Sequence, residues 1–156
     1  MILIFIESDI GGKHLEFTCN KDKITKIMSE ITLALTRLDD LSAKGNKEFL
    51  TNPHHIGSAK YNLIVAIEGS IDICNHLISA NKLKAPEDYA DSFKVLAETG
   101  LFEEAFVQRL IEMARFRNRL VNIYWNLDDE LIFKIITEDL KDIERFLDII
   151  RNLLSR

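Results

Sequence analysis

The spacing of apolar residues along the chain predicts a series of amphipathic helices. In residues 21–41, apolar side chains recur three or four positions apart, as they do on the buried face of a helix. These residues are Ile24, Ile27, Ile31, Leu35, Leu38 and Leu41. Asn20 can cap this helix, since its side chain can accept a hydrogen bond from a first-turn N–H. After a polar connection at 42–51, Asn52 and the proline that follows it predict a second helix at 53–80.

The second half of the chain predicts three more helices. A short helix is expected at 89–99, because Gly100 can adopt the left-handed conformation that ends many helices. A fourth helix is expected at 103–125, and a last one from Asp128 almost to the C-terminus. With short connections between them, these helices predict an all-α fold, an antiparallel four-helix bundle with an additional short helix.

The residues before the first helix differ from the rest. Residues 1–6 are apolar, but no basic residues precede them and no small-residue cleavage site follows, so they make a poor signal peptide. We expect a short strand or a loosely docked tail there, which Gly11 and Gly12 interrupt. The chain therefore divides into an N-terminal extension, 1–20, and a helical bundle domain, 21–156.

Composition narrows the class of protein. The chain has 156 residues, of which 47% are apolar and 29% charged, the balance of one soluble globular domain. Its apolar runs are far shorter than the roughly 20 residues that cross a bilayer, so we expect no membrane segment. Cys19 and Cys74 have no metal-site spacing, and two unpaired thiols fit the cytoplasm. Because no glycine-rich phosphate loop or metal framework is present, we expect neither cofactor nor metal.

Charge indicates a local basic patch in an acidic protein. A net charge of −5 argues against a protein that coats nucleic acid through its overall field. Nevertheless, Arg109, Arg115, Arg117 and Arg119 lie in one segment. Any contact with an anionic partner is therefore expected there.

Arg117 is the most informative of these arginines, because it lies among apolar positions of the predicted fourth helix. At about 100° per residue, several apolar or aromatic side chains fall within about 60° of it on the helical wheel. They are Phe106, Leu110, Met113, Leu120, Val121 and Tyr124. A buried guanidinium must be paired or must line a polar cleft, since an isolated buried charge is costly.

Two explanations for Arg117 stay open. A structural ion pair is available, because Glu68 and Asp72 lie one turn apart on the second helix, and either can support the guanidinium. Tyr61 and Asn75 belong to the same strip of that helix. These polar groups are more than one ion pair needs, which favours a cleft.

The residues around Arg117 resemble a known signature. The stretch from Phe116 to Trp125 reads Phe-Arg-Asn-Arg-Leu-Val-Asn-Ile-Tyr-Trp. It resembles the motif of the HEPN superfamily, an arginine and a polar residue followed within a few positions by a histidine. More narrowly, it is similar to the HepT group, whose form is Arg-Asn-x-Leu-Val-His-x-Tyr. Asn122 stands where that group has histidine.

The resemblance covers most of the chain after about Lys21. Further segments similar to the family's pattern are Ala66-Ile-Glu68 with Ile71-Asp72-Ile-Cys-Asn75-His76, Pro86-x-x-Tyr89 with Ser92-Phe93 and Leu96-Ala97, and Gly100. The resemblance implies a helical bundle that forms a homodimer, brings two motifs to a shared cleft and cleaves RNA without a metal. It also implies an MntA-like nucleotidyltransferase antitoxin as the cognate partner.

The resemblance also implies a role for each motif residue. Arg117 would hold the scissile phosphate as a planar bidentate donor, and Asn118 would orient the phosphate or a partner side chain. The histidine of the family would move the proton of the ribose 2′-hydroxyl. Asn122 has no proton to exchange near neutral pH. We therefore expect weak or absent nuclease activity, whether the substitution is natural or was introduced to make a toxin tolerable.

Tyr124 has two interpretations. An aromatic residue on an apolar helix face usually packs with its hydroxyl towards solvent. In HepT proteins, however, the tyrosine at this position is adenylylated by the antitoxin, and Trp125 could shape the pocket edge. Phe116 and Ile123, seven positions apart on the outward side of the helix, are candidate dimer contacts.

Three hypotheses follow. The first is a HepT-like toxin with an RNA-cleavage cleft built on Arg117, Asn118 and position 122, regulated through Tyr124. The second is a non-catalytic helical module that binds a nucleotidyltransferase or RNA. The third is a helical dimer whose polar cluster is purely structural. Because Asn122 replaces the histidine, the second hypothesis has more support than the resemblance alone would give it.

Overall fold

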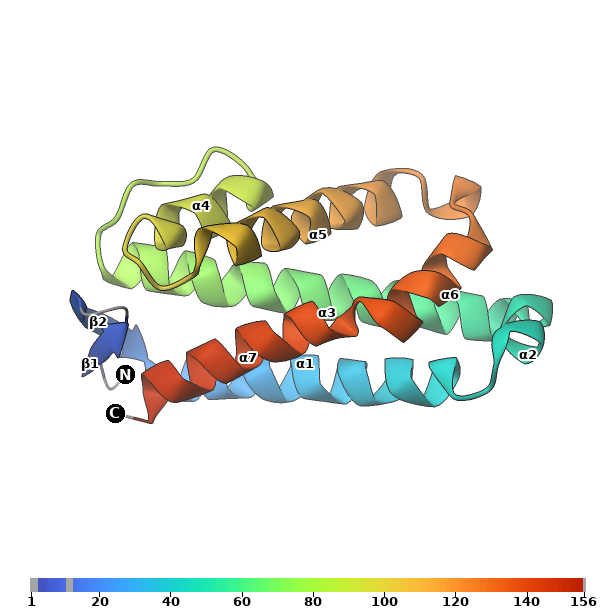
Figure 1. Ribbon diagram of the computed structural model, residues 1–156, viewed down its shortest axis with the longest axis horizontal. Coiled ribbons are helices and arrows are strands. Elements are labelled where there is room, and N and C mark those ends of the chain that lie inside the picture. The colour runs from blue at the N-terminus through green and yellow to red at the C-terminus, as the bar shows by residue number, and fades with distance from the viewer. Residues whose placement is uncertain (1–2, 11–12, 156) are drawn as a thin grey trace.

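Four long helical segments form an antiparallel bundle (Figure 1). The computed structural model describes residues 3–10 and 13–155. The segments are α1 (Lys21–Ser42), α3 (Pro53–Ala80), α5 (Glu104–Asn122) and the consecutive helices α6 (Asp129–Glu138) and α7 (Leu140–Leu154). Helices α1 and α5 run in one direction, and α3 and the α6–α7 pair run back. The predicted all-α bundle is confirmed.

Helix α3 is the central element of the bundle and packs against α1, α5, α6 and α7. Among the described residues it is the one helix long and apolar enough to cross a membrane by length and composition. Its apolar side chains form the middle of the core, with Ile67, Ile71 and Cys74 fully buried. A core helix of a bundle has this composition for that reason. Cys74 and Cys19 are both free thiols, as predicted.

The predicted starts of α1 and α3 are confirmed by their caps. The Asn20 side chain accepts a backbone hydrogen bond of 3.1 Å from the first turn of α1, and Asn52 accepts one of 3.0 Å from α3. The two helices approach closely at Gly69, where an added Cβ would lie 2.6 Å from Ile31. A larger residue at this position would push α1 away from α3.

The short third helix predicted at 89–99 is α4 (Tyr89–Ala97), and it lies antiparallel to the first part of α5. Asp88 caps it by accepting a hydrogen bond of 2.8 Å from Asp91 N–H. The turn into α5 contains Gly100 with φ of 90°, the left-handed conformation expected of it. The connection 81–88 therefore returns from the end of α3 to the middle of the bundle, where α4 begins beside α5.

The predictions for the first connection and for the last helix were wrong. The connection expected at 42–51 contains a short helix, α2 (Asn46–Thr51), which is held because Phe49 is fully buried against Phe133, with ring centroids 5.2 Å apart. The last helix is divided at Asp139, where Asp142 N–H bonds the Asp139 carbonyl at 3.2 Å in a tighter turn. Asp139 is a weak helix former that faces the guanidinium of Arg109 at 3.8 Å.

The fourth helix ends earlier than expected, at Asn122 instead of about Trp125. Ile123 has φ of −130° and ψ of 37°, outside the helical region, and a 3₁₀ turn, η1 (Tyr124–Asn126), follows. The carbonyl of Tyr124 accepts a hydrogen bond from Lys60 of α3. This long-range bond fixes the turn in place, and local sequence could not reveal it.

Two strands precede the bundle. Strands β1 (Leu3–Ile10) and β2 (Lys13–Asn20) pair antiparallel. The Asn81 side chain accepts a hydrogen bond of 2.8 Å from Thr18 N–H and donates one of 2.9 Å to the Thr18 carbonyl. His76 Nε2 accepts a hydrogen bond of 2.9 Å from Asn20 N–H. Side chains at the end of α3 thus anchor β2.

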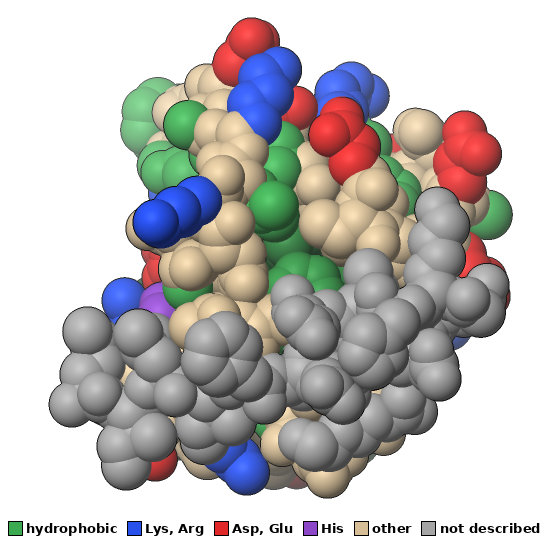
Figure 2. Space-filling view, turned by 90° about the vertical axis from the view of Figure 1, so that its left-hand side faces the viewer, with side chains coloured by type: hydrophobic (Ala, Val, Ile, Leu, Met, Phe, Trp, Pro, Cys, Tyr) green, Lys and Arg blue, Asp and Glu red, His purple; other side chains and the backbone are tan. Residues whose placement is uncertain are grey.

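The expectation of a strand within residues 1–6 agrees with β1 from Leu3 onwards, whereas Met1, Ile2 and the expected interruption at 11–12 lie outside the described residues. Figure 2 looks onto this end of the bundle. Hydrophobic side chains show inside a hollow there, and both basic and acidic side chains lie around its upper rim. The charges at this rim are therefore of both signs, unlike the single-sign surface that binds a polyanion.

Candidate functional site

Arg117 is the centre of the candidate site. Its side chain is 14% exposed, and its Nε donates a hydrogen bond of 2.9 Å to Oε1 of Glu68 on α3, which Nη2 also contacts. Nη1 donates to Oδ1 of Asn118 at 3.3 Å. The guanidinium carbon lies 4.5 Å from the ring centroid of Tyr89, the first residue of α4. Three helices therefore fix the orientation of this group.

Arg117 lies within the buried face of α5, where the helical wheel placed it, but its own side chain is only partly buried. The buried residues of α5 are Phe106, Val107, Leu110, Ile111, Ala114 and Leu120. Val121 is 44% exposed, and Tyr124 lies beyond the end of the helix. On the wheel, Leu120 lies on one side of Arg117 and Ala114 and Ile111 lie on the other, so the buried face extends further to that side than the predicted stripe.

The two carboxylates expected beside Arg117 have different positions. Glu68 forms the ion pair, and its own side chain is 41% exposed. Asp72 forms no hydrogen bond with Arg117 among the described residues. Burial, followed by the neighbouring charge of Glu68, raises the pKa of Asp72. Arg117 is thus clasped by a carboxylate that is itself open to solvent.

A hollow of about 490 Å³ opens beside this cluster. It is lined by Asn75, Pro86, Glu87, Asp88, Tyr89, Ser92 and Asn118. Its walls come from α3, the 81–88 connection, α4 and α5. Asn118, which contacts Arg117, and Tyr89, which stacks on it, both belong to this wall. The arginine is therefore not sealed inside the chain.

Asn122 is not brought to Arg117 within one chain. The five positions between them put Asn122 about 140° around the helix, and about 7.5 Å along it, from Arg117. Asn122 is exposed at the end of α5. No hydrogen bond among the described residues joins it to Arg117 or Asn118. The motif residues therefore present two separate surfaces of one helix.

Tyr124 is positioned by Lys60, a residue that sequence analysis missed. Lys60 Nζ donates a hydrogen bond of 2.9 Å to the Tyr124 carbonyl and lies 4.9 Å from the centroid of its ring. Asp129 Oδ1 lies 3.4 Å from the same ammonium group. The Tyr124 hydroxyl donates to the Gly57 carbonyl at 3.4 Å. A signal was available, because Lys60 lies three positions before Leu63 on the apolar face of α3.

Exposed apolar side chains gather around the end of α5. Among the described residues, the exposed large hydrophobic ones include Val121 at 44%, Ile123 at 40%, Tyr124 at 38% and Trp125 at 82%. Of the two candidate dimer contacts, Ile123 is thus exposed in the single chain, whereas Phe116 is half-buried against the core. This surface is the most apolar exposed area near the motif.

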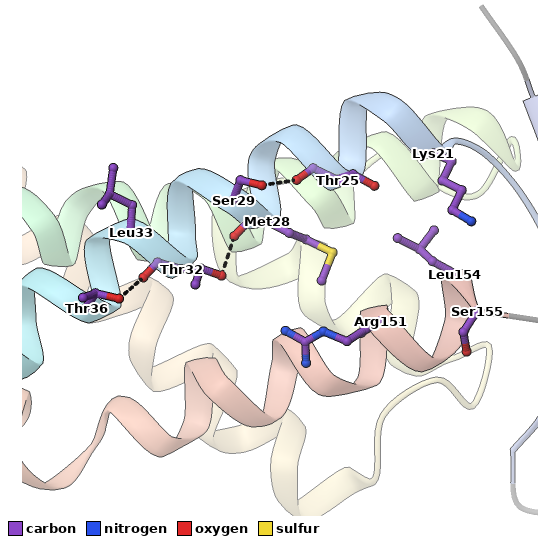
Figure 3. Close-up of a pocket in the computed structure, with 10 residues that line it drawn as sticks. All are labelled: Lys21, Thr25, Met28, Ser29, Thr32, Leu33, Thr36, Arg151, Leu154 and Ser155. Atoms are coloured by element: carbon purple, nitrogen blue, oxygen red, sulfur yellow. Dashed lines mark hydrogen bonds between the residues drawn. The ribbon is translucent and has the colours of Figure 1, made fainter.

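A larger hollow lies elsewhere. It has a volume of about 650 Å³ between α1 and α7, and Figure 3 shows the side chains that line it. Its hydroxyls donate back to helix carbonyls, from Ser29 at 3.1 Å, Thr32 at 2.8 Å and Thr36 at 3.0 Å. Arg151 is paired with Asp148 of its own helix. This groove holds none of the motif residues.

No group of three or more His, Cys, Asp or Glu side chains that could hold a metal ion occurs in the described part of the chain.

A second, smaller hollow lies between α3, α5, α6 and α7, with Phe116 in its wall. At its rim, Arg109 Nε donates to both carboxylate oxygens of Asp142 at 2.8 Å. This pairing raises the pKa of Arg109. Of the four clustered arginines, Arg109 therefore has a structural partner.

Similar proteins support one family. The chain is 32% identical over 90 residues to the mRNA nuclease HepT of Shewanella oneidensis, an alignment that spans 58% of this chain and 68% of that protein. It is 28% identical over 109 residues to a putative RNase of Archaeoglobus fulgidus, across 70% of this chain and 82% of the relative. Both similarities include sequence beyond the short motif.

Solved structures agree with these relatives. The fold matches a tri-AMPylated Shewanella oneidensis HEPN toxin in complex with MNT antitoxin, with a TM-score of 0.78 and 27% identity, over 85% of this chain and 99% of that one. It also matches YutE of Bacillus subtilis, a cytosolic protein of unknown function, with a TM-score of 0.76 over 89% of this chain and 93% of that one. At 19% identity, YutE supports the fold alone.

The family model described as "Ribonuclease HepT-like" matches residues 31–150. This range includes the Glu68–Arg117 pair, the hollow beside it, and the turn that carries Tyr124. The chain thus belongs to the HepT-like ribonuclease family.

Proposed function

We propose that this protein is the toxin of a toxin–antitoxin pair, a HepT-type endoribonuclease attenuated by Asn122. Residues 21–156 would form the functional domain, and residues 1–20 an extension of it. The observation that carries the proposal is the Arg117 guanidinium, which is held by Glu68 and contacts Asn118 and Tyr89 in the wall of a hollow. Two free, buried thiols are consistent with a protein that acts in the cytoplasm.

Arg117 retains donors for a phosphate. A guanidinium has five N–H groups. In the described contacts, Glu68 engages Nε and one side of Nη2, and Asn118 engages one side of Nη1. The remaining N–H groups can bind the non-bridging oxygens of a scissile phosphate and stabilise the charge that develops there. Glu68 would hold the plane of the guanidinium, which explains why a phosphate-binding arginine also has a carboxylate partner.

Cleavage of RNA at this site requires proton transfer that Asn122 cannot supply. The ribose 2′-oxygen attacks the phosphorus, a P–O2′ bond forms, and the bond to the 5′-oxygen of the next nucleotide breaks. The 2′-hydroxyl must lose a proton and the leaving oxygen must gain one. An amide side chain does neither near neutral pH, which lowers the rate by about 10²- to 10⁴-fold.

A homodimer would complete the site. Because Arg117 and position 122 face different directions on α5, one chain cannot direct both at the same phosphate. A second copy docked on the exposed apolar surface at Val121, Ile123 and Trp125 could bring its own motif to the first. We propose that the active form is this homodimer.

The proposed partner is a nucleotidyltransferase antitoxin of the MntA kind. The similar Shewanella oneidensis toxin is AMPylated and in complex with MNT antitoxin. In this chain, Tyr124 occupies the modified position of the motif, and its ring is 38% exposed on a turn fixed by Lys60. Adenylylation there would add bulk and negative charge beside the RNA site and so oppose phosphate binding.

The decisive experiment restores the missing histidine. The purified protein and its Asn122→His variant are incubated with total RNA, with EDTA present, and their oligomeric state is measured by light scattering. We expect cleavage by the variant to exceed that of the parent by about 10²- to 10⁴-fold. Asn126→His, which places a histidine on the neighbouring turn, is the control and should remain inactive.

Asn122 itself favours a second candidate, a non-catalytic module that binds RNA or the nucleotidyltransferase through the same surface. If Asn122→His is folded and dimeric but cleaves no RNA, the nuclease proposal is wrong and this second function is supported. A monomer that neither cleaves nor binds RNA would instead leave the polar cluster with a structural role.

A further inference from the structure

The hollow beside Arg117 contains two amide groups whose orientation is fixed. Oδ1 of Asn75 accepts a hydrogen bond of 2.7 Å from Oγ of Ser92, a side chain that is only 1% exposed. Oδ1 of Asn118 accepts from Arg117 at 3.3 Å. Because each carbonyl oxygen faces a donor, each Nδ2 amino group points away from that donor. Both residues line the hollow and neither Nδ2 group has a hydrogen bond to another described residue, so each amide keeps its donors for a ligand.

At the rim of the hollow, hydrogen-bond acceptors take the place of donors. Glu87 lines the same hollow, and its carboxylate has no hydrogen bond or ion pair with another described residue. Asp88 also lines the hollow, but one of its oxygens already caps α4 through Asp91 N–H. A ligand in the hollow thus meets donors on the α3 and α5 side and an acceptor on the connection side. Two carboxylates at the rim make a second phosphate an unsuitable occupant.

A nucleobase satisfies this pattern. Guanine and uracil each carry a keto oxygen beside a ring N–H, so they can accept from the amides and donate to Glu87. At the corresponding positions, C6 of adenine and C4 of cytosine carry an amino group in place of the keto oxygen, and the ring nitrogen beside it has no hydrogen. That amino group would face an amide amino group, donor against donor. The volume of about 490 Å³ lies within the range of about 300–1,000 Å³ common for ligand pockets.

We propose that this hollow is the subsite for a keto nucleobase next to the scissile phosphate, and that Asn75 is its specificity-determining residue. Asn75 Nδ2 donates to the keto oxygen, and Ser92 is a positioning residue that prevents the amide from flipping. The inference rests on the proposed RNA site at Arg117, which borders the hollow through Asn118 and Tyr89.

The first test measures binding and does not depend on cleavage. Four 2′-O-methyl RNA tetranucleotides, which lack the attacking hydroxyl and differ in one base, are titrated into the wild-type protein and followed by NMR. We expect at least about tenfold tighter binding when that base is guanine or uracil. Equal binding of the four tetranucleotides, or binding of none, would overturn the inference.

Three variants assign the preference to Asn75. Asn75→Asp keeps the oxygen that Ser92 contacts but replaces the donor with an acceptor, so the preference should disappear. Ser92→Ala leaves the amide free to turn and should reduce the preference without removing phosphate affinity. Asn152→Asp adds the same charge on the exposed side of α7 and should behave as wild type. Retention of the keto preference in Asn75→Asp would contradict the assignment.

The second test uses the Asn122→His nuclease and maps the base beside each cleaved bond. Cleavage next to guanine or uracil that becomes indiscriminate in the Asn75→Asp double variant supports the subsite. Cleavage with an unchanged base preference rejects the subsite but leaves the nuclease proposal intact. Absence of any cleavage counts against the nuclease proposal, and the tetranucleotide titration still decides the subsite.

Discussion

Two cations on apolar helix faces, Arg117 and Lys60, have different surroundings. The Lys60 side chain is 7% exposed, and its ammonium group is used by a backbone carbonyl, a tyrosine ring and Asp129. Arg117 is 14% exposed, its main partner Glu68 is 41% exposed, and a hollow opens beside it. The first cation holds a turn in place, whereas the second retains N–H groups for a ligand.

The comparison shows why burial alone does not separate structural from functional charges. Both groups are paired, as buried charges must be. What differs is the partner. A backbone carbonyl cannot move away without unfolding the turn, but a half-exposed carboxylate can be solvated when a phosphate arrives. Substitution of Arg117 should therefore affect function, and substitution of Lys60 should affect stability.

The largest expected effect is on the activity carried by Arg117. In the Asn122→His background, Arg117→Lys should reduce RNA cleavage by about 10²- to 10³-fold, because lysine keeps the charge but loses the planar array of donors. The free energy of unfolding in urea should change little, since Glu68 is open to solvent. Initial rates on a fluorogenic RNA substrate provide the measurement.

Arg119→Lys is the matched control for that prediction. Arg119 is exposed two positions further along the same helix, so the exchange alters the same residue type without touching Glu68 or the hollow. Its cleavage rate should stay within about twofold of the parent. Full activity in Arg117→Lys would remove the guanidinium from the proposed mechanism, whereas equal losses in both variants would indicate a diffuse basic surface instead.

The next effect is the loss of stability when Lys60 is replaced by methionine. Methionine preserves the packing of the aliphatic stem but leaves the Tyr124 carbonyl without its donor, which should cost about 1.5–3 kcal/mol. Urea unfolding followed by circular dichroism measures this cost. Trp125, the one tryptophan of the chain, reports on the same turn, and its fluorescence anisotropy should fall.

Lys44→Met supplies the comparison for Lys60. Lys44 forms a surface pair with Glu48, with 3.8 Å between Nζ and Oε1 and with both side chains exposed. Pairs of this kind contribute about 0–1 kcal/mol. If Lys60→Met were no less stable than Lys44→Met, the buried ammonium group would not be what holds the turn.

The sequence predicted those parts of the fold that depend on local signals. Asn20 and Asn52 were recognised as caps, and Gly100 as a left-handed helix end, because each acts within one turn of its own position. The early end of α5 was missed, since it depends on Lys60, which is distant in sequence. The break at Asp139 was missed because the apolar spacing continues across it, from Ile136 to Leu140 and Ile143.

The candidate site was predictable to a similar extent. Glu68 was identified from helical spacing, because both it and Arg117 lie on regular helices whose faces can be calculated. The contacts of Tyr89 and Ser92 could not be foreseen, since the irregular 81–88 connection determines where α4 begins. Helical periodicity therefore located the ion pair, but only the path of a loop located the hollow beside it.

The smallest expected effect concerns His76. This residue contacts the strand end of the molecule and is independent of both cations. Burial, and then the positive charge of Lys23, lowers the pKa of His76 from its ordinary value of 6.5. The folded state therefore binds a proton less readily than the unfolded state. The resulting stability is present above pH 6.5 and is lost as the pH falls through the lowered pKa, because protonated Nε2 cannot accept from Asn20 N–H.

Urea midpoints of the wild type and His76→Gln between about pH 8 and about pH 5 test this, since histidine changes charge in that range. The wild type should lose up to about 1 kcal/mol relative to the variant, whose amide oxygen still accepts but does not titrate. Asp72, with a raised pKa, titrates in both proteins and cancels in the difference. Trp125 fluorescence should stay constant, because its turn is held by Lys60 at the start of α3, whereas His76 lies near the end of that helix. Parallel pH curves for the two proteins would show that the His76 contact contributes nothing to the anchoring of β2.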